Sequence, residues 1–382
     1  MDLSYSEEQR LLAEAADRFV KERYGFEARR AIVQSEEGFS RAIWRAFAEL
    51  GWLGLPIAEE HGGLSAGAVE TGILMEAFGR ALVVEPYVST VVVGASLVGA
   101  LASANQRAEL LPAVVEGKSL LAFAHGEPKA RFALEDVATK AKRTKNGWRI
   151  SGRKEMVIGG PSADTLLVSA RIAGKRQDRG GIGVFAVPAK QRGIASTNFV
   201  TLDGGRASHI ALDNVEVAAA ALLGASDDAL PAIEAVIDRT IAALAAEAVG
   251  AMQVLLDTTI AYTKQRVQFG RPISDNQVLR HRMAAMAVRV EEARASALKA
   301  AILADAEPLP RALAASSAKA KVGRAGRFVA EQAVQLHGGM GVTEELSVGA
   351  YFKRLMAIEI LFGSPDHHLA RHAKLSRLAE AA

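Results

Sequence analysis

Cysteine is absent from the 382-residue sequence, which excludes disulfide bonds, thiolate catalysis and cysteine-ligated metal sites. An excess of one charge sign is also lacking, since 46 Lys and Arg face 43 Asp and Glu and the formal net charge is only +3. Nucleic acid is therefore not the expected partner, although a local basic patch could still hold a phosphate-bearing ligand. With 50% hydrophobic residues the chain can bury a large core and should divide into two or three domains.

Long hydrophobic runs are missing as well. The most apolar stretches, residues 82–84 and 91–101, contain or adjoin Gly and Pro breaks and fall short of the roughly 20 residues that span a bilayer. The N-terminus is acidic and has no basic segment followed by an apolar stretch, so no signal peptide is predicted. We expect a cytoplasmic protein without a membrane span.

The hydrophobic periodicity changes twice along the chain. Apolar residues recur at three and four over residues 1–117, which predicts an N-terminal helical domain. Residues 118–225 hold short runs rich in Val, Ile, Leu and Phe, which predict a middle β domain with strands near 148–152, 165–170, 183–187 and 207–212. Residues 226–382 return to long Ala-rich amphipathic helices, predicted at 232–266, 278–304 and 309–337. The fold class is α+β, and the last domain is predicted to pack as a four-helix bundle.

Two segments of the C-terminal domain carry residues suited to a dinucleotide. In residues 264–277, Arg266 offers a fork of donors that fits a pyrophosphate, and Phe269 offers an apolar face for a ring. In residues 333–341, Gly338 and Gly339 provide backbone without Cβ, which lets a phosphate approach the amide N–H groups. Each feature alone is weak, because a Gly-Gly pair usually caps a helix and an Arg beside a Phe is usually surface. It is the order and spacing of these features together that make the pattern specific.

With residues 355–368, these segments resemble the acyl-CoA dehydrogenase flavoprotein family, whose signatures read R-x-x-F-G…Q and Q-x-x-G-G-x-G. The resemblance covers essentially the whole chain and looks closest to the small-subunit type of pimeloyl-CoA dehydrogenase. It implies a β-barrel or sandwich as the middle domain, FAD as cofactor, α,β-desaturation of an acyl-CoA, and electron-transfer flavoprotein or a similar acceptor.

In the resembled family the two segments reach across a dimer interface and hold the ADP half of a neighbour's FAD. The implied assembly is a dimer or a dimer of dimers. The matching positions imply cofactor-binding roles for Arg266, Gln268, Phe269, Gln277, Gln335, Gly338 and Gly339.

The segments that would face the isoalloxazine depart from the family pattern. Gly126 stands where a flavin-bonding Thr is expected, and Lys129 and Arg131 replace small glycines. Met156 replaces a Trp and Ile158 a Thr. Two side-chain hydroxyl donors are therefore lost, and backbone amides of the same strand are their possible substitutes.

The catalytic base is missing from both positions that the family uses. Desaturation needs a carboxylate to take the α-proton. The family's Y-E-G-T falls on residues 361–364 and puts Phe362 at the base position, while the alternative site before an Arg falls on Thr240 and Ile241. The carboxylates left as candidates are Glu359, Asp366 and Glu247. Each has a competing structural interpretation: Glu359 as a solvated helix charge, Asp366 as a helix N-cap, and Glu247 as a buried partner of an Arg.

Two further polar pairs need interpretation. Asp238 and Arg239 match the family's acidic-basic entry to the acyl-CoA pocket, with a surface ion pair as the alternative. His367 and His368 would point about 100° apart on a helix, so no metal site is predicted.

The leading hypothesis is a subunit of a heteromeric acyl-CoA dehydrogenase, paired with a homologous second subunit and acting on a bulky or dicarboxylic acyl-CoA. The retained neighbour-facing motifs and the absent base motivate it. The alternatives are a homo-oligomer with a relocated carboxylate base, a flavin monooxygenase or nitroalkane-oxidase-like enzyme on this fold, and a structural subunit without flavin.

Overall fold

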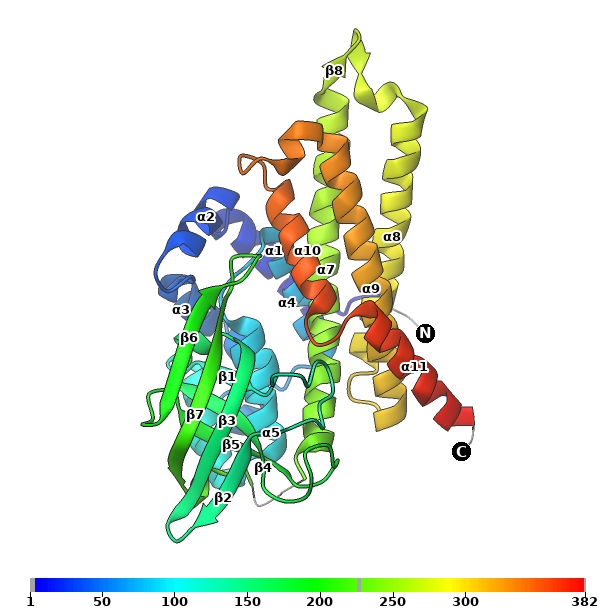
Figure 1. Cartoon of the computed structure of the whole chain (residues 1–382). Helices are drawn as coiled ribbons and strands as arrows, with labels where there is room; N and C mark the ends of the chain where they lie inside the picture. Colours follow the sequence, from blue (N-terminus) through cyan, green and yellow to red (C-terminus); the bar gives the residue numbers. More distant parts are fainter. Residues whose placement is uncertain (1–3, 225–227, 381–382) are drawn as a thin grey trace. The chain divides into compact units, whose positions relative to one another are not determined.

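A computed structural model describes residues 4–224 and 228–380 (Figure 1). By its internal contacts the chain forms two compact units, each built from separated stretches of sequence. The first unit comprises Met1–Ala31, Ala68–Val83 and Ile241–Ala382, and the second comprises Ile32–Gly67 and Val84–Thr240. The three-segment division by sequence stays a prediction.

The α-helices are α1 (Glu7–Arg23), α2 (Phe26–Gln34), α3 (Arg41–Glu49), α4 (Ala68–Ala81), α5 (Ser96–Leu101), α6 (Ala104–Val115), α7 (Leu230–Gln265), α8 (Gln277–Ile302), α9 (Pro308–His337), α10 (Val348–Ile360) and α11 (Pro365–Glu380). The strands are β1 (Leu121–Ala124), β2 (Lys140–Thr144), β3 (Gly147–Ile158), β4 (Thr165–Arg171), β5 (Ile182–Pro188), β6 (Ile194–Val200), β7 (Arg206–Ala218), β8 (Val267–Gln268) and β9 (Arg271–Pro272).

The first unit is a helical bundle, and its long helices confirm the predicted ones at α7, α8 and α9. Figure 1 shows α8, α9 and α10 running alongside the C-terminal part of α7. Ala242, Ala300 and Ala318 form a buried cluster where α7, α8 and α9 meet, and their small side chains let the helices approach closely. Helix α4 packs against both α1 and α8.

Helices α4 and α7 cross with their backbones in contact. A Cβ added at Gly79 would overlap the carbonyl of Glu247, and one added at Gly250 would overlap the carbonyl of Glu76. Only glycine fits at these two points, so the crossing fixes the position of α7 relative to α4.

Helix α7 is long and apolar enough, by length and composition alone, to cross a membrane. However, 83% of its apolar stretch is buried inside the protein, as in the core helix of a globular protein. Burial in the protein is therefore sufficient to explain the apolar composition of α7, and no membrane is needed.

The second unit contains a curled seven-stranded sheet with the order β1-β4-β2-β3-β7-β6, and β5 pairs with β4. Strands β1 and β4 are parallel, whereas β3 and β7 form a long antiparallel pair. The four predicted strand runs are confirmed as β3, β4, β5 and β7. In the core of this sheet Trp148 meets Phe185 edge to face, with ring centroids 5.5 Å apart.

The second unit also contains a π-helix at Val88–Ala95, a rare conformation that is frequent at functional sites. The hydroxyl of Thr90 donates to the carbonyl of Leu121 and accepts from its amide, both at 3.2 Å. These bonds tie the π-helix to the start of β1.

Candidate functional site

The α7–α8 connection, which holds three of the seven predicted cofactor residues, is an exposed hairpin at one end of the first unit (Figure 1). Phe269 lies at its tip with a φ of 53° and is 102% exposed. Arg266, Gln268 and Gln277 are exposed as well. A large aromatic side chain in a left-handed backbone conformation is uncommon, and at this tip nearly the whole ring is exposed.

The end of α9 lies at the same end of the bundle. The ring of His337 stacks on Tyr262 near the end of α7, with centroids 4.4 Å apart, and its Nδ1 donates to the carbonyl of Ala333 at 2.8 Å. Burial lowers the pKa of His337, so the ring stays neutral. This contact places the end of α9 beside the base of the hairpin.

The glycine pair that follows is open to its surroundings. Gly338 has a φ of 59°, and apart from its neighbours along the chain no heavy atom of the described residues lies within 4 Å of a Cβ built at Gly338 or Gly339. Gln335 is exposed one turn earlier. With Arg266 and Phe269, this end presents a guanidinium, an aromatic ring and bare glycine backbone, which fit the pyrophosphate and ring of the ADP half of FAD.

Phe362, which the resemblance places at the position of the base, lies in a tight turn after α10. Phe362 follows α10 with a φ of 58°, and its carbonyl accepts a hydrogen bond from His368 Nε2 at 2.9 Å. Lys319 donates to the carbonyls of Ile358 and Glu359 at the end of α10. Burial lowers the pKa of Lys319 to about 7 and that of His368 to about 4. The turn is held firmly, and it contains no proton acceptor at Phe362.

Glu247, on α7, is buried and held by an arginine. Arg354 donates from Nε to Oε1 at 2.6 Å and from Nη2 to Oε2 at 2.7 Å. Both carboxylate oxygens are therefore occupied, in agreement with the interpretation of Glu247 as a buried partner of an Arg.

Glu359 is held in the same way by Arg327, at 2.9 and 2.5 Å. It is only 8% exposed, so it is not a solvated helix charge. Asp366 lies in the first turn of α11, and its side chain is 89% exposed with Arg324 at 3.3 Å. Ser364, whose Oγ accepts from the amide of His367 at 3.3 Å, caps this helix instead of Asp366.

The alternative base position and the expected entrance to the acyl-CoA pocket lie in the first part of α7. The hydroxyl of buried Thr240 donates to the carbonyl of Val236 at 2.7 Å, and Ile241 is fully buried. Asp238 is 2% exposed and Arg239 is half-buried. This burial argues against a simple surface ion pair.

Two segments of the second unit are the ones that the resemblance places at the flavin, and their side chains differ from the family pattern. Lys129 and Arg131 have φ values of 71° and 51°, the left-handed region where the family has glycine. Met156 has a φ of 53°, is 48% exposed and lies at a register shift between β3 and β7. Gly126 accepts at its carbonyl from the amide of Glu155 at 2.7 Å, which joins this segment to β3.

A buried polar network, which the sequence reasoning missed, supports the same segment. Lys154 is completely buried and donates from Nζ to Glu127 (2.6 Å), Ser169 (3.0 Å) and the carbonyl of His125 (3.2 Å). Burial lowers its pKa to about 8, while Glu127 acts in the opposite direction. The sequence signal for this network is Lys154 itself, a lysine that stands within a strand pattern.

Metal clusters are not found in the described ranges, 4–224 and 228–380, where no group of three or more His, Cys, Asp and Glu side chains converges.

Comparison with known proteins covers the whole chain. Models of the N-terminal, middle and C-terminal domains of acyl-CoA dehydrogenases match residues 6–118, 122–215 and 230–375. The probable acyl-CoA dehydrogenase YngJ of Bacillus subtilis is 30% identical over 372 residues, which cover 96% of this chain and 97% of that protein.

Two solved structures are similar over nearly their full length. The Tcur3481-Tcur3483 steroid ACAD G363A variant has a TM-score of 0.88 and 29% identity, covering 98% of this chain and 99% of that one. A chain of the ChsE4-ChsE5 complex from Mycobacterium tuberculosis has a TM-score of 0.89 and 27% identity, covering 100% of this chain and 99% of that one. The chain therefore belongs to the acyl-CoA dehydrogenase family of FAD-dependent oxidoreductases, which act on CH–CH donors.

Proposed function

We propose that this chain is one of two homologous kinds of subunit in a heteromeric acyl-CoA dehydrogenase, and that it completes its neighbour's FAD site without supplying a base. The observation that carries the proposal is the occupation of the base position by Phe362, while Glu247 and Glu359 each have both oxygens held by a guanidinium. In each pair the guanidinium engages both carboxylate oxygens and fixes the orientation of the side chain.

The neighbour-facing residues keep the features that the cofactor needs. Arg266 is exposed to pair with a pyrophosphate, Phe269 to cover a ring, and the glycine pair to bring amide N–H groups close to phosphate oxygens. When bound, FAD supplies the acceptor for the hydride from the substrate's β-carbon. The residues proposed to hold it are Arg266, Gln268, Phe269, Gln277, Gln335, Gly338 and Gly339.

Two relatives support a two-subunit assembly and a bulky substrate. The solved structures Tcur3481-Tcur3483 and ChsE4-ChsE5 are each named as a pair of chains, and the first is named a steroid enzyme. We therefore propose a bulky acyl-CoA as the preferred substrate class. A dicarboxylic acyl-CoA, as in the small-subunit type of pimeloyl-CoA dehydrogenase, is the second candidate. Asp238 and Arg239 are proposed to line the entrance for the CoA part, and electron-transfer flavoprotein or a similar carrier to take the electrons.

Purification of the chain by itself tests this proposal. We expect a preparation without the flavin absorbance band and without dehydrogenase activity, and both should appear when the homologous subunit and FAD are added. In the reconstituted enzyme Arg266→Ala should lower flavin retention, whereas Arg282→Ala, an exposed arginine on α8, should not. A yellow, fully active homo-oligomer would contradict the heteromer.

A relocated base is the second candidate, and one observation favours Asp366 for it. Asp366 is the candidate carboxylate with the most exposed side chain and the longest ion-pair distance, 3.3 Å. If the chain alone is active, Asp366→Asn should lower the rate by several orders of magnitude. Oxygen consumption separates a monooxygenase or oxidase from a dehydrogenase, which passes electrons to a carrier.

A further inference from the structure

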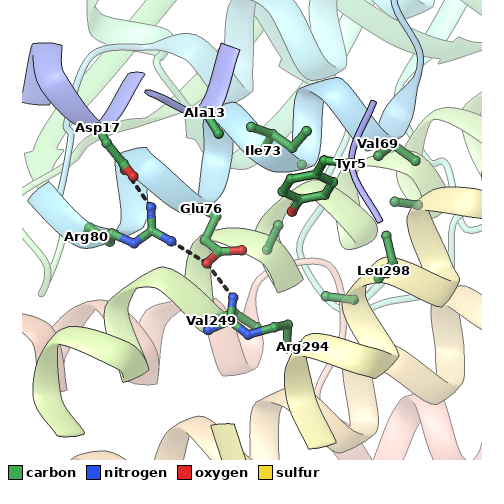
Figure 2. A pocket seen from close by; sticks show the side chains of 14 residues that line it. Tyr5, Ala13, Asp17, Val69, Ile73, Glu76, Arg80, Val249, Arg294 and Leu298 are labelled. Carbon is green, nitrogen blue, oxygen red and sulfur yellow. Dashed lines mark hydrogen bonds and ion pairs between the residues drawn. The ribbon is translucent and has the colours of Figure 1, made fainter. Parts of the chain in front are cut away.

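A cavity of about 380 Å³ lies within the first unit, between the start of α1 and helices α4, α7 and α8 (Figure 2). Its walls are formed largely by small and aliphatic side chains, among them Gly72, Ile73, Ala246, Val249, Ala297 and Ala301. The backbones of α4 and α7 already touch at Gly79 and Gly250, so these helices cannot move together to close it. The space is therefore a lasting feature of the bundle.

One end of the cavity is polar, and Glu76 is at its centre. Its Oε1 accepts hydrogen bonds from Arg80 at 2.6 Å and from Arg294 at 2.5 Å, drawn as dashed lines in Figure 2. Among the residues that the structure describes, no donor reaches its Oε2. Glu76 as a residue is 9% exposed, and its Oε2 keeps unused acceptor capacity at the wall of the cavity.

The charges around the cavity cancel. Arg80 also donates to Asp17 at 2.5 Å, and Arg294 donates to Gln253 at 3.1 Å, so both guanidinium groups are engaged. An anion would lie beside the negative charges of Glu76 and Asp17, and a cation would lie beside the positive charges of Arg80 and Arg294. Tyr5, at the rim, stays protonated because burial raises its pKa. These features select an uncharged ligand with a hydrogen-bond donor.

We propose that this cavity binds a small uncharged molecule with an apolar ring or chain and one hydroxyl group, which donates to Glu76 Oε2 while the apolar part packs against α4, α7 and α8. The size is sufficient, because apolar cavities of about 150 Å³ already hold benzene. None of the lining residues is proposed to bind FAD or to act as base, and on α7 Ala246 lies about 140° around the helix from Ile241. The site therefore shares no residue with the proposed flavin chemistry.

Calorimetric titration of the full chain with 4-methylphenol, toluene and benzoate tests the proposal. The phenol should bind saturably and about tenfold or more tighter than toluene, because a hydrogen bond to a charged acceptor accounts for at least that factor. Phenol binding no tighter than toluene binding, or weaker than benzoate binding, would overturn it.

Variants locate the site. Ala301→Leu fills the cavity and should weaken phenol binding by about tenfold or more, whereas Ala285→Leu, at an exposed position of the same helix, should leave it unchanged. Glu76→Gln should reduce the affinity for the phenol toward that for toluene. Binding to Ala301→Leu as tight as to the wild type would refute the location, and the thermal midpoint of each variant shows that it is folded.

Discussion

Replacement of Glu247 by Gln separates a structural carboxylate from a catalytic one. The side chain of Glu247 is 3% exposed and that of Arg354 is 19% exposed, so the pair is desolvated on both sides. Loss of one partner from such a pair leaves an uncompensated buried charge, which costs about 3–5 kcal/mol. Because an amide oxygen can still accept one hydrogen bond, we expect Glu247→Gln to lower the free energy of unfolding by about 3 kcal/mol, the lower limit of that range.

The same reasoning predicts a graded series among the candidate bases. Glu359 is itself shielded, but Arg327 is 52% exposed, so Glu359→Gln should cost about 1–2 kcal/mol. Asp366 and Arg324 are 89% and 61% exposed, so Asp366→Asn should change the stability by less than about 0.5 kcal/mol. Stability losses should therefore follow burial and not closeness to Phe362.

Urea unfolding followed by far-UV circular dichroism measures the series, because most helical residues, including those of α8 to α11, lie in the first unit. Fluorescence reports the other unit, since Trp44, Trp52 and Trp148 all lie there. As a control, Glu247→Leu combined with Arg354→Met should recover much of the stability that either change alone removes. If Glu247→Gln leaves unfolding unchanged but lowers the rate of an active enzyme by several orders, the ion pair is not its role and Glu247 is the base.

Three further predictions concern the buried groups of both units. Lys154→Met should destabilise the second unit by about 3 kcal/mol, read from tryptophan fluorescence, because Glu127 remains buried without its cation, and a simultaneous Glu127→Leu should restore much of this loss. Burial lowers the pKa of His368 from 6.5 to about 4, so the unfolded chain binds the proton more readily and stability falls as the pH drops below 6.5. The loss should reach about 2 kcal/mol at pH 5, and urea titrations of His368→Gln should show a smaller one. Gly79→Ala should lower the thermal midpoint strongly, since its Cβ meets backbone, whereas Gly72→Ala, whose Cβ would lie 3.7 Å from that of Ala246, should not.

The sequence predicted the elements whose patterns are regular. Helices α7, α8 and α9 are long, rich in alanine and almost free of breakers, so their periodicity was clear. Strand β2 reads Lys-Ala-Lys-Arg-Thr, and the edge strand β6 is mostly exposed, so neither has the apolar alternation by which strands are recognised. The π-helix at Val88–Ala95 has no local composition signal.

At the candidate site, the sequence motifs indicated which residues to consider. The contacts that define the roles of these residues are visible only in the folded structure. The family's motif, laid on the sequence without gaps, put Phe362 at the base position. The partner of Glu247 lies 107 residues away, and that of Glu359 lies 32 residues before it, on another helix. No periodicity joins residues at such separations, because only the packing of α7, α9 and α10 brings them together.

The most direct test of the central claim is a count of flavin per subunit in the complex purified from its native source. The account predicts two homologous kinds of chain and fewer FAD molecules than chains, with the carboxylate base in the other chain. A complex of this chain alone, with one FAD per chain and full dehydrogenase activity, would contradict it.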